Sequence, residues 1–215
     1  MKLPFTIEQF LDVFRQYNIA VWPVQVFFIV LALVAVYFSI RSKTYSNKGI
    51  VCILAFFWLW MGIIYHLVFF SRINKAAMVF GTLFIIQATV FLYFGLIKNK
   101  PSIRLRIDMY GITGMILIVF ALLIYPLLGY WLGHSYPYSP TFGLPCPTTI
   151  FTFGILLFSD SKISPWVLII PFLWSLIGFS AAFSLGMKED TSLVIAGLLS
   201  VAMILYRNKS LKASM

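Results

Sequence analysis

The sequence has little charge and few of the residue types that usually carry chemistry. Charged residues make up 10% of the 215 residues, and His and Cys number two each. Ordinary soluble domains contain about 25% charged and about 45–50% apolar residues, whereas 61% of this chain is hydrophobic. So few charges could not cover the surface of a soluble protein of this size. The composition therefore predicts an integral membrane protein whose main partner is the lipid bilayer.

The motifs of the common catalytic sites are also missing. The sequence contains no Gly-x-Ser-x-Gly, His-Glu-x-x-His, phosphate-binding glycine loop or Cys-x-x-Cys. No Lys lies in the middle of an apolar run, which argues against a retinal-type chromophore. The lack of mid-run ionisable residues argues against a proton pump with a buried carboxylate chain and against a voltage sensor. Enzymatic activity is therefore the less favoured interpretation.

Long apolar runs are what the sequence does have, and a transmembrane helix needs about 20 apolar residues. Seven candidate spans follow one another, at 21–40, 49–70, 76–97, 109–132, 147–158, 165–185 and 191–206. We expect an all-α fold, a polytopic helical bundle that forms one domain over 21–206. An N-terminal segment at 1–20 precedes the bundle, and a basic cytoplasmic tail at 207–215 follows it.

The fifth run is too short to cross a bilayer unaided. Its 12 residues give about 18 Å of helix at roughly 1.5 Å per residue, against a hydrocarbon core of about 30 Å. Irregular backbone at 142–146 would then also lie at membrane depth, where it is tolerated only inside protein or beside a water-filled cavity. This segment is predicted to be either a short span or a re-entrant half-helix.

The distribution of positive charge predicts the orientation of the bundle. With seven spans, 11 of the 16 Lys and Arg residues fall on the side of the C-terminus and five on the side of the N-terminus. Basic loops stay in the cytoplasm, so we expect the N-terminus outside and the C-terminus inside a cell (inner) membrane. The net charge of +10 is thus explained without nucleic acid. No cleavable signal peptide is evident.

The N-terminal segment has the signature of an amphipathic helix. Thr6 and Gln9 have the spacing of a capping box, and Phe5 and Phe10 that of a hydrophobic staple. Such a helix lies in the interface plane. We expect it to turn into the first span near Pro23, and it is either a plain anchor or a lid over a site.

A few polar and aromatic residues near the outer side are candidates for a binding site, because polar groups in a bilayer are costly. These residues are Asn18, Trp22, Gln25, Tyr65, His66, His134 and Cys146. Cys146 lies between two prolines, and Pro147 is expected to begin a helix. The positive end of that helix would favour a thiolate. Cys146 is therefore a metal ligand, a nucleophile or a small structural residue in a kink.

One Cys and two His would suit a soft metal ion, zinc or copper. The candidate metal ligands are Cys146 and His66, with His134 as a further neighbour. Their wide separation in sequence means that no spacing rule supports the cluster. The alternative for His66 is a structural histidine near the membrane interface.

Three functions remain open on this basis. The first is a small transporter or channel with a site near the outer face, and a soft metal ion is its favoured cargo. The second is a binding or sensing subunit that acts with a partner membrane protein or a second copy. The third is a membrane enzyme with Cys146 as its thiol nucleophile.

Several sequence blocks together resemble a known family. They are 5–10, 17–23, Tyr65-His66, 142–149 and 174–178. They are similar to a prokaryotic family of multipass membrane proteins labelled only as a domain of unknown function, number 6064. The resemblance covers nearly the whole chain. It implies a single membrane domain from a bacterium or archaeon and brings with it no activity or site residues.

Overall fold

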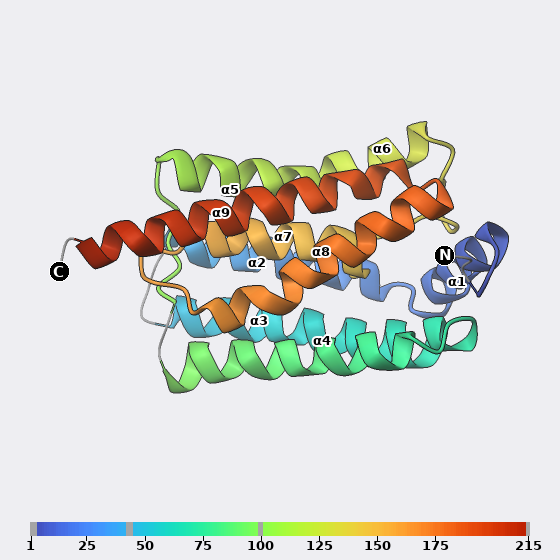
Figure 1. Ribbon diagram of the computed structural model, residues 1–215, viewed down its shortest axis with the longest axis horizontal. Coiled ribbons are helices and arrows are strands. Elements are labelled where there is room, and N and C mark those ends of the chain that lie inside the picture. The colour runs from blue at the N-terminus through green and yellow to red at the C-terminus, as the bar shows by residue number, and fades with distance from the viewer. Residues whose placement is uncertain (1–3, 42–44, 99–100, 214–215) are drawn as a thin grey trace.

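The protein is an all-α helical bundle in the computed structural model, which describes residues 4–41, 45–98 and 101–213 (Figure 1). In this described part, six helices are long and apolar enough to cross a membrane. They are α2 (Val24–Arg41), α3 (Ser46–Trp60) with η1 (Met61–Phe69) and η2 (Phe70–Arg72), α4 (Ala77–Leu92) with η3 (Tyr93–Ile97), α5 (Met109–Val119) with η4 (Phe120–Ile124) and α6 (Tyr125–Trp131), α8 (Pro165–Leu185), and η5 (Lys188–Asp190) with α9 (Thr191–Ala213). The predicted membrane bundle is confirmed.

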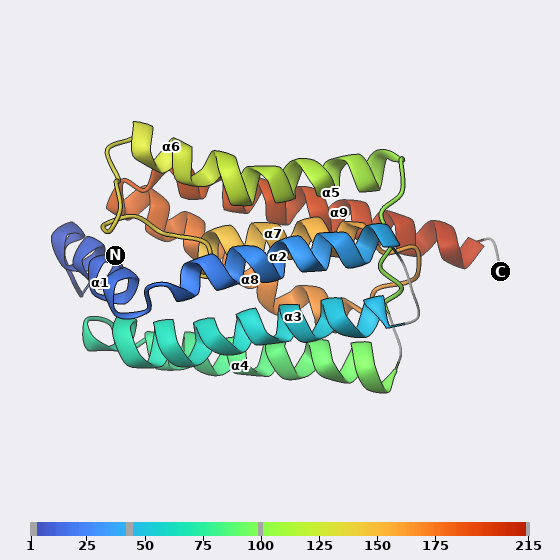
Figure 2. The same ribbon diagram turned by 180° about the vertical axis from the view of Figure 1, so that it is seen from behind.

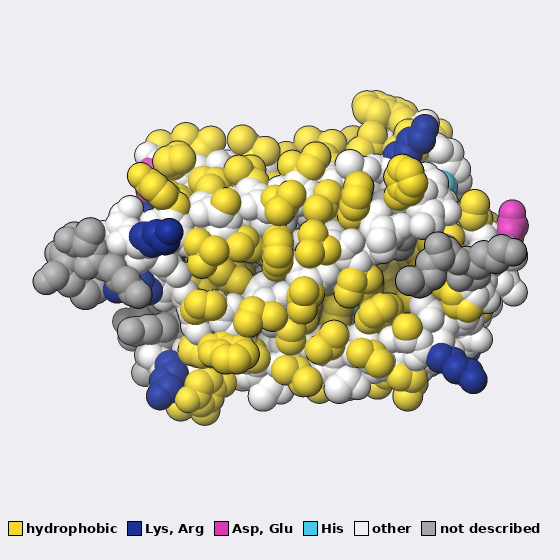
Figure 3. Space-filling view, in the orientation of Figure 1, with side chains coloured by type: hydrophobic (Ala, Val, Ile, Leu, Met, Phe, Trp, Pro, Cys, Tyr) yellow, Lys and Arg dark blue, Asp and Glu magenta, His cyan; other side chains and the backbone are white. Residues whose placement is uncertain are grey.

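The long helices run back and forth between two ends of the bundle (Figures 1 and 2). One end, which we call the α1 end, carries the short helix α1 (Ile7–Ala20) and the turns after η2, α6 and α8. The opposite end carries the last residues of α9. Hydrophobic side chains cover the side of the bundle, and the Lys and Arg side chains in view lie near the two ends (Figure 3). This distribution suits a protein whose sides face lipid.

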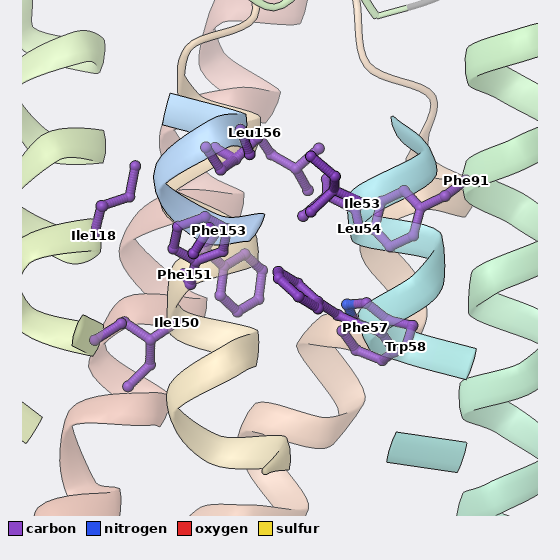
Figure 4. Packing of buried hydrophobic residues seen from close by; sticks show 14 of the residues in the cluster. Ile53, Leu54, Phe57, Trp58, Phe91, Ile118, Ile150, Phe151, Phe153 and Leu156 are labelled. Carbon is purple, nitrogen blue, oxygen red and sulfur yellow. The ribbon is translucent and has the colours of Figure 1, made fainter. Parts of the chain in front are cut away.

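The short helix α7 (Pro145–Leu157) forms the centre of the bundle (Figure 4). Twelve of its 13 residues are buried. Phe151 packs against Phe57, with ring centroids 6.1 Å apart, and the indole of Trp58 donates a 3.1 Å hydrogen bond to the hydroxyl of Thr152. Other helices, and not lipid, therefore surround α7, so its polar first turn and short length are tolerated.

The path of the chain decides between the two predictions for this segment. The preceding helix α6 ends at the α1 end, whereas the following helix α8 begins at the opposite end (Figure 1). The segment therefore crosses the bundle as a short span and does not return to the same side. The helix begins at Pro145, two residues earlier than we expected, with Leu144 in the N-cap position. Cys146 consequently lies inside the first turn, and the expectation that Pro147 begins the helix is wrong.

Helix α1 lies across the α1 end of the bundle and has the predicted capping box. The backbone amide of Thr6 donates to Gln9 Oε1 at 2.9 Å, and the amide of Gln9 donates to the Thr6 hydroxyl at 3.3 Å. Phe5 stacks on Phe10 with ring centroids 5.8 Å apart, as the staple predicts. The inner face of the helix includes the fully buried Tyr17, whose hydroxyl accepts a 3.0 Å hydrogen bond from Trp60.

Two segment boundaries differ slightly from the predicted ones. The first span begins at Val24, after a turn at 21–23 that separates it from α1. At the other terminus α9 continues as a helix through Ala213, past residue 206, where we expected a tail. Arg207 is buried there and donates a 2.9 Å hydrogen bond to the carbonyl of Leu157 at the end of α7. This contact gives the first residue of the expected tail a place in the bundle.

Candidate functional site

A cavity of about 430 Å³ lies at the α1 end of the bundle. Seven of its 20 lining residues are aromatic, and the rings come from α1, η1, η2, α4, α8 and the residues before α1. These ring residues are Phe5, Phe10, Phe14, Tyr65, Phe70, Phe80 and Trp174. Pockets of about 300–1,000 Å³ with apolar walls and a few polar groups are typical of small-molecule sites.

A small number of polar side chains complete the wall. They are Asn74, Cys146, Ser180, Ser184 and Asp190. Asp190 ends η5, directly before α9, and only 3% of its surface is exposed. Its Oδ1 accepts a hydrogen bond from the hydroxyl of Tyr125, and the thiol of Cys146 lies near the same carboxylate. The amino end of α9 adds partial positive charge that favours a carboxylate at this position.

The neighbouring acidic residue has a different partner. Glu189 is fully buried, and its Oε1 lies 2.8 Å from Nδ1 of His134, whose side chain is 15% exposed. Glu189 Oε2 has no hydrogen-bond partner. Asp190 forms none of the ion pairs found among the described residues, although it borders the cavity. The carboxylate that borders the cavity thus has one neutral donor, Tyr125, and no ion-pair partner among the described residues.

Two of the residues predicted for the site, Tyr65 and Cys146, line this cavity. Tyr65 belongs to the π-helical segment η1, which interrupts the long second span. Irregular π segments of this kind frequently occur at functional sites. Cys146 comes from the first turn of α7, and its sulfur lies 3.9 Å from the position that a Cβ on Gly178 would take. The glycine on α8 thus lies next to the thiol, and Cδ2 of Leu193 is packed 2.7 Å from the same Cβ position.

His66 lies behind the cavity wall and not in it. Its ring is fully buried and packs against Phe84 and Trp174, with centroid distances of 4.6 and 5.1 Å. Neither ring nitrogen has a hydrogen-bond partner. His66 supports Trp174, which does line the cavity. The structure thus places this histidine in an aromatic cluster next to the site.

The remaining predicted site residues lie outside the cavity lining. Asn18 is fully buried and donates to the carbonyls of Pro137 and Ser139 at 2.8 and 2.9 Å. Gln25 donates a 2.9 Å hydrogen bond to the carbonyl of Asn18, so both residues hold the loop that leads into α7. Trp22 is 62% exposed. Asn18 and Gln25 stay predictions as site residues, and the contacts observed for them join the end of α1 to the loop before α7 and to the start of α2.

The described residues contain no group of three or more His, Cys, Asp or Glu side chains that could hold a metal ion. His134 pairs with Glu189, His66 is enclosed by aromatic rings, and Cys146 faces the cavity. A three-ligand cluster of these residues is therefore not formed. The soft-metal site of Cys146 and His66 stays a prediction, and the cavity has a different chemical character.

Sequence reasoning overlooked Asp190 and Trp174 as site residues. Asp190 was not among the predicted site residues, although the pair Glu189-Asp190 between two apolar runs was a visible signal. Buried carboxylates at membrane depth are costly, and such residues mark functional sites. Trp174 gave no comparable signal, because it lies within an apolar helix whose inward face cannot be identified from the sequence.

The comparison with known proteins agrees with the architecture. Residues 7–214 match the model of a family described as a family of unknown function, DUF6064. The chain belongs to this family. The match covers α1 and the bundle, so the predicted resemblance is confirmed. No curated protein and no solved structure matches the chain, and an account of its function therefore begins from the cavity.

Proposed function

We propose that this membrane protein binds a small organic ammonium ion in the cavity at the α1 end. The observation that carries the proposal is the Asp190 carboxylate, which borders an aromatic-walled cavity and has no ion-pair partner among the described residues. A ligand that combines positive charge with an apolar body would complement both features.

The charge argument starts from the cost of an isolated buried carboxylate. A carboxylate in a low-dielectric site is strongly disfavoured unless it is paired or accepts several hydrogen bonds. Tyr125 offers a neutral donor to Asp190, but this donor leaves the net charge unbalanced. A bound cation would supply the missing charge, and its attraction to Asp190 would be strengthened by the apolar surroundings.

The walls favour an organic cation over a hydrated metal ion. Trp, Tyr and Phe rings attract cations through the negative face of the ring, and cages of such rings recognise quaternary ammonium groups. The cavity has seven ring residues in its wall, three of them from α1 and the residue preceding its N-cap. Helix α1 would thus form one wall of the site. Of its two predicted roles, lid and plain anchor, this position favours the lid.

The cavity opens toward the outside of a cell membrane in this proposal. The support is the charge distribution of the sequence, because the predicted topology puts 11 of the 16 Lys and Arg residues on the side of the C-terminus and basic loops are retained in the cytoplasm. The α1 end, with the cavity, would then be external. A ligand would reach Asp190 from the outer leaflet or the outer solution.

Transport of the bound ion is a second candidate, favoured by the interrupted helices. Three of the long helices in the described part contain π segments, η1, η3 and η4, and α8 contains Pro171 in its interior. Transporters commonly build their sites from helices that are interrupted at membrane depth. Uptake of a radiolabelled ammonium ion into proteoliposomes would separate transport from binding alone.

A set of matched probes tests the proposal. We expect benzyltrimethylammonium to bind the purified protein in detergent at least about tenfold more tightly than its uncharged isostere neopentylbenzene, because Asp190 and the rings discriminate by charge. Phenylacetate, which carries the opposite charge, should not bind. Calorimetric titration gives the affinities, with ligand concentrations corrected for partition into micelles.

Two results of this titration would contradict the proposal. Equal binding of the ammonium ion and the neutral isostere would mean that the cavity is merely apolar. Tight binding of Zn²⁺ or Cu⁺, with no binding of the ammonium ion, would favour the metal prediction made for Cys146 and His66.

A further inference from the structure

A second hollow lies at the opposite end of the bundle and is lined by lysines. It has a volume of about 690 Å³ and lies between η3, the start of α8 and the last turns of α9. Lys98, Lys162 and Lys209 contribute to its wall, and no Asp or Glu belongs to the lining in the described part of the chain. None of the three ammonium groups takes part in an ion pair with a described residue. The hollow is thus strongly positive and unneutralised; we call it the lysine groove.

Aromatic residues place the lysine groove at the level of lipid head groups. Tyr93, Trp166 and Tyr206 belong to the same three helical segments, and their exposed fractions are 42%, 66% and 68%. Exposed Trp and Tyr side chains mark the membrane–water interface. The ammonium group of Lys98 lies 5.7 Å from the ring centroid of Tyr93. This basic residue and this aromatic residue therefore lie at the same depth.

The lysine groove is held in place by fixed contacts between its walls. The side chain of Asn208 on α9 accepts a hydrogen bond from the amide of Ile163 and donates one to the carbonyl of the same residue, at 3.1 and 2.8 Å. This pair of bonds holds together the two segments that carry Lys162 and Lys209. Ser164, the N-cap residue of α8, makes no side-chain capping bond. Ser164 and Pro165 both line the hollow, so the positive end of this long helix also borders it.

We propose that the lysine groove binds an anionic phospholipid, with the phosphate among the three lysines and the acyl chains against apolar wall residues. Basic pockets between transmembrane helices are suited to such head groups. The groove contains apolar side chains, among them Phe94, Ile163 and Leu205, which a free phosphate ion would leave uncovered. A lipid therefore fits the groove better than a soluble anion. This site is independent of the ammonium cavity at the α1 end.

Native mass spectrometry of the full chain from a non-ionic detergent tests the proposal, with phosphatidylglycerol and phosphatidylcholine as the probes. We expect wild-type protein to retain phosphatidylglycerol in preference to phosphatidylcholine. The triple variant Lys98→Gln, Lys162→Gln, Lys209→Gln should lose about tenfold or more in affinity for phosphatidylglycerol, because each lysine near the surface contributes to attraction of an anionic lipid.

The matched control removes three positive charges from the same end but outside the groove, as Arg41→Gln, Lys48→Gln, Arg104→Gln. This control should bind phosphatidylglycerol as wild type does. Equal retention of both lipids by wild type, or an equal loss of binding in the two triple variants, would overturn the proposal. Displacement of the lipid by millimolar glycerol phosphate would also overturn it, since a soluble anion would then be the better ligand.

Discussion

Replacement of Asp190 by asparagine is expected to weaken the binding of benzyltrimethylammonium by about 100-fold, since removal of one partner of a desolvated charge pair has effects of this order. Asparagine keeps the shape of the side chain and can still accept a hydrogen bond from Tyr125. Only the negative charge is removed from the cavity wall. Calorimetric titration of the purified variant gives the change in affinity.

The controls for this variant distinguish an effect of the charge at Asp190 from an effect of the net charge of the protein. Glu8 is an exposed acidic residue of α1 at the same end of the bundle, so Glu8→Gln changes the net charge equally and should leave the affinity as in wild type. Asp190→Glu retains the charge and should restore part of the binding. If Asp190→Asn bound the ammonium ion as tightly as wild type while remaining folded, the carboxylate would have no part in the site.

The second large effect concerns the contact between α5 and α7. A Cβ at Gly154 would lie 2.7 Å from the carbonyl oxygen of Gly114 and 2.7 Å from Cγ1 of Ile118. The backbone of α5 cannot move aside cheaply, because α7 lies in the centre of the bundle. We expect Gly154→Ala to lower the free energy of unfolding by about 1–3 kcal/mol, the usual cost of overpacking a dense core. Thermal unfolding in detergent, followed by circular dichroism, measures this loss.

The control for the glycine experiment lies elsewhere in the same bundle. A Cβ at Gly129 in α6 would lie 3.6 Å from Oε1 of Glu189 and 3.7 Å from the carbonyl oxygen of His134, which is ordinary contact. Gly129→Ala should therefore leave the stability unchanged or raise it slightly, because alanine favours the helix. An equal melting temperature for Gly154→Ala and Gly129→Ala would contradict the close approach of α5 and α7.

Much of the fold follows from local features of the sequence. The apolar runs predict the six long helices because a membrane span needs only length and hydrophobicity. The N-terminal helix is predicted by Thr6 and Gln9, since a capping box lies within four consecutive residues. The unusual character of the fifth segment was also evident from its length. Its central position was not, because burial by neighbouring helices depends on tertiary contacts.

The site was harder to predict, since it depends on which face of each helix points inward. Tyr65 and His66 are adjacent in the sequence, yet Tyr65 lines the cavity and His66 lies behind it. An apolar helix has no polar face that would distinguish the two positions. The sequence therefore grouped Cys146 with both histidines only because all three were predicted to lie on the same side of the membrane. The tertiary structure instead places the thiol beside Asp190, a residue brought there by the short turn between α8 and α9.

Alkylation of Cys146 tests the ammonium site most directly, because the thiol lines the cavity. In a Cys52→Ser background, which removes the second, exposed cysteine, the rate of reaction with N-ethylmaleimide reports access to this one sulfur. The ammonium site predicts that benzyltrimethylammonium slows the reaction in a saturable way and that Asp190→Asn abolishes the protection. A reaction rate that does not change at any concentration of the ammonium ion would contradict it.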